Sequence, residues 1–401
     1  MSKKNDDFFK QKKDWSEVKD QLLGCYFKPY IQKVLHTRKP IAYVDCFAGK
    51  GKFEDGNPGS PIIALDTINE CVSKTTMASS YIETTFIDLN YGEDLKKNLS
   101  GYPRVNIISG RFEDNIDGIL QNKNGYNVFL YIDPYGIKAL NCAMFDRFAN
   151  NGFYSIELLI NMNSFGFIRE ACHAMGTTFS IDDKAIFDDL VEYDPTELSA
   201  SDKSVLELDE IAGGTYWHTI IKDYNDKKID GYEAEERFAR QYCQRLMKSY
   251  KYVLNMPLRI KRGQRPKYRM IHATNHPDGC LLMVDNICNR WQALQDIQNQ
   301  GQLSFFEEDI NNNAVDMVDL EQKAITYFSK YKTYISLNMA LSQFFVEFGP
   351  ICKKHYIIDI LNGFEKDYKI EIQRTPQLTA TGKPTKFMEE NSKQKVWIRW
   401  R

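Results

Sequence analysis

The feature that most constrains the fold of this chain is an alternation of short apolar runs with segments of helical length. Apolar runs occur at 41–44, 82–87, 104–108, 127–132 and 154–160, and helical patterns begin at Ser60-Pro61 and cover 91–99, 113–121 and 139–149. Short runs that are almost wholly apolar are typical of strands buried on both faces, and strands that alternate with helices form a parallel sheet. The sequence therefore predicts an α/β, Rossmann-like domain, preceded by an amphipathic helix at 16–35.

The rest of the chain predicts an insertion, the end of the sheet and a smaller domain. An acidic stretch within about 176–232 reads as an insertion with short helices, and a helix follows at 233–249. Strands at 250–258 and 267–274 and a helix to about 298 complete a domain at 1–298. A linker at 299–316 leads to helices at 318–331, 337–346 and 351–362 and a hairpin of strands at 368–374 and 394–400. Three helices and a two-stranded wing predict a winged-helix-like domain at 317–401.

The composition excludes several classes of protein and site. The net charge of −2 over 401 residues is unlike that of a basic nucleic-acid binder, so any nucleic-acid surface is local. The nine cysteines include no Cys-x-x-Cys pair, which argues against a zinc site or an iron–sulfur cluster. No apolar run approaches the roughly 18 residues that span a bilayer, and the charged N-terminus is unlike a signal peptide. We expect a cytoplasmic protein with no metal site and no membrane segment.

A glycine-rich loop follows the first predicted strand and indicates a cofactor site. A dinucleotide-binding fingerprint needs a third glycine where Glu54 stands, and a phosphate-binding Walker A loop needs Ser or Thr where Phe53 stands. An acid at the strand end followed by Phe-x-Gly-x-Gly fits S-adenosylmethionine (SAM) better, because glycines let a ligand approach the backbone closely. The alternative is a glycine-rich surface turn. The expected cofactor contacts in this loop are Asp45, Phe47, Gly49 and Gly51.

Residues after the second and third strands extend this prediction. Asp88 ends the second strand, where a carboxylate can accept the ribose hydroxyls of a nucleoside, although such an Asp is as often a helix cap. Phe112 and Glu113 follow the third strand, where they would flank an adenine ring and accept its amino hydrogens. Glu113 also suits the first turn of the next helix, where a negative charge is favourable.

The segment Asp133-Pro134-Tyr135-Gly136 follows the fourth strand and carries the most suggestive chemistry. Methyl transfer is an in-line displacement in which alignment and charge complementarity do most of the work. The Asp133 carboxylate and the Pro134 carbonyl can accept the hydrogens of an amine, and Tyr135 can stack on a planar base. The alternative is a type I or II turn, with Pro at its second position and Gly136 at its fourth.

Two further groups are candidate substrate contacts. Asn161 and Asn163 end the fifth strand, where they would contact substrate or cap a helix. A basic loop between the last two strands would hold a phosphate backbone or be a solvated charged turn. Its residues are Arg259, Lys261, Arg262 and Arg265.

These motifs together resemble the three-Cys-motif partner (TcmP) family, bacterial proteins with a class I methyltransferase-like domain. The resemblance covers roughly residues 8–295. It rests on Trp15-Ser16 through Lys19, Val44 through Gly56 with Gly59-Ser60-Pro61, Tyr131 through Gly136, Asn161 through Gly166 and Lys267 through Gly279. Cys46 and Lys50 depart from the Gly and Pro expected in the glycine loop. The resemblance implies a partner protein that bears three cysteines and is similar to radical-SAM enzymes.

The sequence thus favours a SAM-dependent methyltransferase that acts on an exocyclic amine of a nucleic-acid base. Asp133-Pro134-Tyr135-Gly136 is similar to the Asp-Pro-Phe-Gly of tRNA guanine N2-methyltransferases and one proline short of the Asp-Pro-Pro-Tyr of adenine N6-methyltransferases. The alternative is a non-catalytic Rossmann-like scaffold that binds a partner protein or nucleic acid through its C-terminal domain, because a fold alone does not fix a function.

Overall fold

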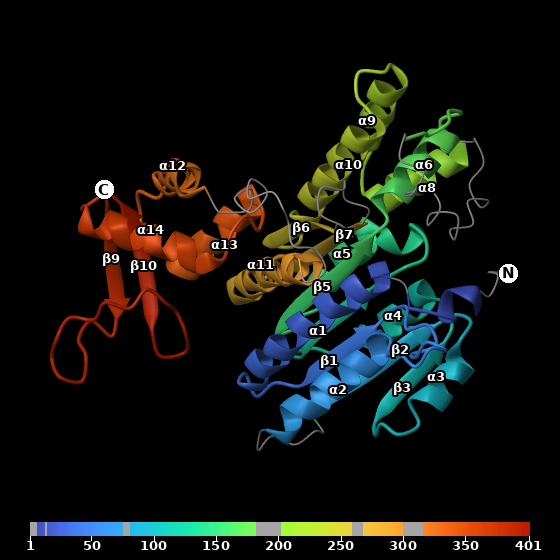
Figure 1. The fold of residues 1–401 in the computed structure, drawn as a ribbon, viewed down its shortest axis with the longest axis horizontal. Coiled ribbons are helices and arrows are strands. Elements are labelled where there is room, and N and C mark those ends of the chain that lie inside the picture. The colour runs from blue at the N-terminus through green and yellow to red at the C-terminus, as the bar shows by residue number, and fades with distance from the viewer. Residues whose placement is uncertain (1–5, 13, 75–80, 182–201, 259–267, 300–315) are drawn as a thin grey trace. The chain divides into compact units, whose positions relative to one another are not determined.

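The structure is a computed structural model that describes residues 6–12, 14–74, 81–181, 202–258, 268–299 and 316–401. The chain divides into two compact units, Met1–Asn275 and His276–Arg401. Figure 1 shows the α/β arrangement of the first unit and the smaller second unit in orange and red. The two units are described separately below.

Seven strands of the first unit form one sheet in the order β3-β2-β1-β4-β5-β7-β6. The strands are β1 (Ile41–Asp45), β2 (Ile82–Asp88), β3 (Val105–Ser109), β4 (Asn127–Ile132), β5 (Ser155–Met162), β6 (Tyr252–Leu258) and β7 (Tyr268–Thr274). Strands β1 to β5 pair in parallel, whereas β7 is antiparallel to both β5 and β6. The sheet confirms the predicted Rossmann-like, class I methyltransferase-type fold.

Alternate residues of the central strands face two different helix layers, as the period of two in a strand requires. Val44 and Leu130 point into a core shared with α4, α5, α6, α8, α9 and α10. Tyr43 and Phe129 point to the opposite face, where they pack against aromatic rings of α1. Because both faces are covered, the strands are apolar almost throughout, and this is the pattern by which the sequence predicted them.

Most helices of the first unit lie close to the predicted ranges, whereas η1 and α6 were not predicted. They are η1 (Asp6–Phe9), α1 (Asp14–Leu35), α2 (Ser60–Ser73), α3 (Gly92–Asn98), α4 (Phe112–Leu120), η3 (Lys138–Leu140), α5 (Cys142–Ala149), α6 (Ser164–Ala174), α8 (Asp202–Ala212), α9 (Tyr216–Asn225) and α10 (Gly231–Leu246). Helices α8 and α9 come from the acidic insertion, of which residues 182–201 lie outside the described part. They bury Leu208 and Trp217 in the main core, so this part of the insertion is integral to the domain.

In its described residues, the second unit combines four helices with a small antiparallel sheet. Its elements are α11 (Pro277–Asn299), α12 (Met317–Phe328), β8 (Ile335–Ser336), α13 (Leu337–Phe348), α14 (Lys354–Lys366), β9 (Ile370–Thr375) and β10 (Lys395–Trp400). The sheet order is β8-β10-β9, and the short strand β8 was not predicted. Helix α11 packs against α13 and α14, whereas the sequence analysis ended the first domain after this helix. The winged-helix assignment stays a prediction.

Two predicted absences, of a membrane segment and of a metal site, can be compared with the structure only for the described residues. No helix there has both the length and the apolar character needed to cross a membrane. No group of three or more His, Cys, Asp or Glu side chains in the same residues is placed to hold a metal ion. The nine cysteines are all free thiols.

Candidate functional site

The glycine loop leaves the carboxyl end of β1 with two residues in the left-handed region. Gly49 has φ of 58° and Gly51 has φ of 75°, which favours glycine at both positions. A Cβ atom on Gly49 would lie 2.9 Å from the Phe9 ring, and one on Gly51 would lie 3.1 Å from Leu95. The loop therefore needs glycine for its own backbone and packing, before any ligand is considered.

Asp45 ends β1 and is fully buried. Its carboxylate accepts hydrogen bonds from the Phe47 amide at 3.2 Å and from the Ser60 hydroxyl at 2.6 Å. Burial raises the pKa of Asp45 to about 7, although these two hydrogen bonds act in the opposite direction. Ser60 borders the cavity described below and Asp45 does not, so the carboxylate predicted to face the cofactor lies one layer behind the cavity wall.

Asp88 ends β2 and joins two loops at this edge of the sheet. One carboxylate oxygen accepts the Gly49 amide at 2.9 Å, and the other accepts the amides of Asn90 and Tyr91, each at 2.8 Å. Asp88 lines the cavity, where the sequence placed it for binding ribose. Three hydrogen bonds from backbone amides already hold this carboxylate, so it also has a structural role in fixing the glycine loop.

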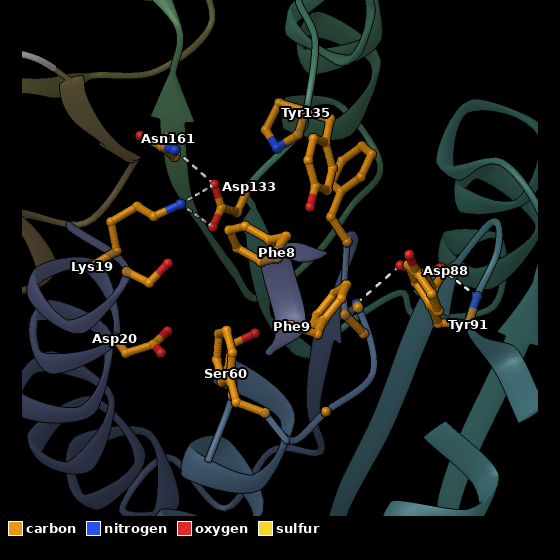
Figure 2. A pocket seen from close by; sticks show the side chains of 18 of the residues that line it. Phe8, Phe9, Lys19, Asp20, Ser60, Asp88, Tyr91, Asp133, Tyr135 and Asn161 are labelled. Carbon is orange, nitrogen blue, oxygen red and sulfur yellow. Dashed lines mark hydrogen bonds and ion pairs between the residues drawn. The ribbon is translucent and has the colours of Figure 1, made fainter. Parts of the chain in front are cut away.

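Asp133 follows β4, the strand next to β1, and has partners from two other elements. The Lys19 ammonium of α1 lies 2.8 Å and 2.6 Å from its two carboxylate oxygens. The Asn161 amide of β5 donates to the first of these oxygens at 2.7 Å. Figure 2 shows Lys19 and Asn161 reaching Asp133 from separate elements. The sequence predicts Asp133 and Asn161 as residues of the site, but it does not predict Lys19 there.

A cavity of about 140 Å³ brings most of the predicted residues together. The predicted residues among its walls are Phe47, Gly49, Gly51, Asp88, Asp133, Pro134, Tyr135, Asn161 and Asn163. Its volume is below the roughly 300–1,000 Å³ usual for small-molecule sites. The carboxyl ends of β1, β2, β4 and β5 thus surround one space, as expected for a ligand site in an open α/β sheet.

The N-terminal segment closes part of this cavity and was not predicted to be there. Phe9 packs against Phe53 and Tyr91 with ring centroids 5.8 Å and 4.9 Å away, which forms a small aromatic cluster apart from the main core. Phe8 meets Tyr135 edge to face at 5.8 Å. In the view of Figure 2, Phe8 and Phe9 lie between Asp133 and Asp88. The cleft is therefore partly filled by the chain's own aromatic rings.

The cavity is lined by three carboxylates, those of Asp20, Asp88 and Asp133, and by the two ammonium groups of Lys19 and Lys52. Asp20 pairs with Lys12 at 2.9 Å, yet burial raises the pKa of Asp20 to about 6. The negative charge of Asp133 contributes to the raised pKa of Asp20, and the charges of Asp133 and Asp20 contribute to the raised pKa of Asp45. Such surroundings favour a cationic ligand, because a positive charge would relieve the repulsion between the carboxylates.

The remaining predicted site residues lie elsewhere or have a second role. Phe112 is buried in the main core, 5.4 Å from the Phe47 ring, and neither Phe112 nor Glu113 borders the cavity. Gly136 also lies outside the cavity walls. Asn163 caps α6 by accepting the Gly166 amide at 2.8 Å, and it lines the cavity as well. The basic loop, with Arg259, Lys261, Arg262 and Arg265, lies outside the described residues.

Two sequence signals could have located the missed residues. Lys19 stands three, four and seven residues before Leu22, Leu23 and Tyr26, so it continues the buried stripe of α1. A lysine in such a stripe is unusual unless its charge is paired. The adjacent rings of Phe8 and Phe9, directly before an amphipathic helix, likewise indicate a segment that packs on the domain.

Comparisons with known proteins add little beyond the fold. No family model and no curated protein sequence matches the chain. One similar solved structure is the Escherichia coli protein titled "Putative methyltransferase yhhF", with 16% sequence identity and a TM-score of 0.22. The similarity covers 33% of this chain and 68% of that one. A likeness this distant carries no conclusion about activity or substrate.

Proposed function

We propose that this chain is a SAM-dependent methyltransferase that acts on an exocyclic amine of a nucleic-acid base. The observation that carries the proposal is the common cavity, to which β1 and β4, paired side by side, both contribute their following loops. Asp88 and the glycine loop lie at one end of it and Asp133 at the other. A methyltransferase needs this combination, because cofactor and acceptor must meet in one enclosed place.

The polar residues of the cavity fit the charged part of SAM. The carboxylates of Asp20, Asp88 and Asp133 suit its sulfonium and ammonium cations, and the ammonium groups of Lys19 and Lys52 suit its carboxylate. The nucleoside end fits only after a movement, since the Phe9 ring covers the open side of Gly49. Bound SAM would supply an electrophilic methyl group at this site.

The roles of the chain's own residues follow from their positions. The Asp133 carboxylate and the Pro134 carbonyl would accept the hydrogens of an acceptor amine and so aim its lone pair. The proton released on methylation would pass to solvent through the open side of the site. Tyr135 has 49% of its surface exposed beside Asp133, where its ring can stack on a planar base.

Calorimetric titration with SAM, combined with transfer of a labelled methyl group to total RNA and DNA, tests this function. We expect binding by the wild-type protein, and loss of transfer without loss of binding in Asp133→Ala. Absence of SAM binding, with Asp45→Ala changing nothing, would contradict the proposal.

A second candidate function is a non-catalytic scaffold that works with a three-cysteine, radical-SAM-like partner protein or with nucleic acid. The glycine loop favours this candidate, because the Phe9 ring packs against Gly49 and the Asp88 carboxylate accepts the Gly49 amide without any ligand. The second unit also exposes Lys383, Lys386 and Lys393 between β9 and β10, which suits a phosphate backbone. Binding of the partner or of nucleic acid that is lost on deleting 276–401, yet kept in Asp133→Ala, would support this candidate.

A further inference from the structure

We propose that Lys19 is a positioning residue of the methyl-transfer site, which neutralises Asp133 and thereby selects an uncharged acceptor group. The inference rests on the proposed function and deepens it by assigning the preference for an uncharged acceptor to Lys19. It is carried by the ion pair between Lys19 and Asp133, which joins the N-terminal helix to the end of β4. Lysine and arginine side chains of proteins arrive as cations and must lose a proton before they can attack the methyl group, and these are the acceptors that this arrangement disfavours.

The position of the Lys19 ammonium is fixed by its surroundings. Its side chain is 7% exposed, and it extends from a helix whose Leu22 and Leu23 are completely buried. A lysine in such a place is costly unless a carboxylate pairs with it. Asp133 supplies that carboxylate and is itself 22% exposed, so the pair lies at the boundary between the protein interior and the cavity.

Asp133 keeps capacity for one further hydrogen bond. The oxygen that accepts from Asn161 also accepts from Lys19, whereas for the other oxygen Lys19 is the one donor that the described contacts include. A carboxylate offers about four lone-pair sites. One donor of an acceptor group can therefore bind without displacing Lys19.

The charges of the neighbouring groups determine which kind of acceptor group can donate this further hydrogen bond to Asp133. Asp20, the next acid on α1, already pairs with Lys12. A cationic acceptor that bound Asp133 would place a second positive charge beside the Lys19 ammonium. Two like charges held by the same carboxylate repel strongly in a partly buried site, because solvent screens them weakly. An exocyclic base amine or a hydroxyl group donates a hydrogen bond without carrying that charge, so it fits the paired Asp133.

The test compares ligands that share a shape and differ in charge. SAM carries a sulfonium cation, sinefungin carries an ammonium group at the same place, and S-adenosylhomocysteine is neutral there. Affinities for all three are measured by calorimetry for wild type, Lys19→Met and Lys19→Arg. Lys28→Met is the matched control, because Lys28 lies on the same helix and pairs with Glu70 at the surface.

Lys19→Met should shift the preference towards the two cationic ligands, relative to S-adenosylhomocysteine, by at least tenfold, because Asp133 loses its counter-ion. Lys19→Arg should restore the wild-type preference, and Lys28→Met should leave it unchanged. A loss of affinity that is equal for all three ligands would show that Lys19 has a structural role alone, and it would overturn the inference. Methylation of poly-lysine by the wild type would overturn it as well.

Two further outcomes separate this inference from the function on which it rests. If the wild type binds none of the three ligands, the proposed function fails and this inference fails with it. If the wild type binds SAM and the preference does not change in Lys19→Met, only the inference fails. Should Lys19→Met not fold, Lys19→Gln keeps a hydrogen-bond donor without the charge and is expected to give the same shift in preference.

Discussion

Asp45→Asn is predicted to stabilise the first unit, and more so at pH 8 than at pH 5. Burial raises the pKa of this carboxyl from 3.8 to about 7. A carboxyl with a higher pKa in the folded state binds its proton more tightly there than in the unfolded state. Its contribution to stability is therefore complete below the unfolded pKa of 3.8, declines as the pH rises and is lost above the folded pKa of about 7.

The magnitude follows from the size of this shift. One pKa unit corresponds to about 1.4 kcal/mol, so the two units between pH 5 and a pKa of about 7 amount to about 3 kcal/mol. The Ser60 hydroxyl must turn to face the new amide, which reduces the gain equally at both pH values and leaves the difference between them unchanged. An asparagine keeps an oxygen that can accept the Phe47 amide, so the substitution removes the titration while preserving this hydrogen bond.

The assay is urea unfolding of the full chain at both pH values, followed by circular dichroism. The gain in unfolding free energy of Asp45→Asn over wild type should be larger at pH 8 than at pH 5 by up to about 3 kcal/mol. Gln121→Ala is the control, because Gln121 is exposed at the end of α4 and carries no titratable group, so its effect should not change with pH. Equal effects of Asp45→Asn at both pH values would refute the reasoning.

Two other predictions concern the glycine loop of the site, and a third concerns a buried ion pair. Gly49→Ala should lower the free energy of unfolding by about 1–3 kcal/mol more than Gly56→Ala in thermal unfolding. Both glycines have positive φ, and of the two Gly49 is the one that faces the Phe9 ring. Equal losses would mean that this contact is unimportant. Phe9→Ala should increase the association rate of SAM severalfold in stopped-flow measurements, since the ring covers the glycine loop, and an unchanged rate would show that it does not obstruct entry. Arg269→Met should lose about 3–5 kcal/mol by denaturant unfolding, because the buried Glu235 carboxylate would lose its counter-ion. Adding Glu235→Leu should recover part of that loss, and a double variant no more stable than the single one would contradict this.

The sheet and the location of the site could be predicted from local sequence patterns. Each buried strand is recognisable in the sequence as an apolar run, and the residue that ends a run lies at the carboxyl edge of a parallel sheet. Asp88 and Asp133 were placed at one edge by this rule, and both line the cavity. The rule does not resolve depth, however, so it could not show that Asp45 lies behind Ser60.

The partners of these carboxylates depend on packing between distant segments. Lys19 is 114 residues from Asp133, and only the packing of α1 on the sheet brings them together. The closure of the glycine loop by Phe9 is likewise a tertiary contact without a local signature. Phe112 shows the opposite case, in which a residue predicted to contact a ligand is part of the core. It is the first apolar residue of α4, and its ring is buried in the main core instead of facing the cavity.

The most direct test of this account is a crystal structure of the protein grown with S-adenosylhomocysteine at saturating concentration. The account predicts that the ligand lies in the cavity between the glycine loop and Asp133, with the Phe9 ring displaced from Gly49. A crystal in which Phe9 still covers Gly49 and the ligand is bound elsewhere, or not bound, would contradict it.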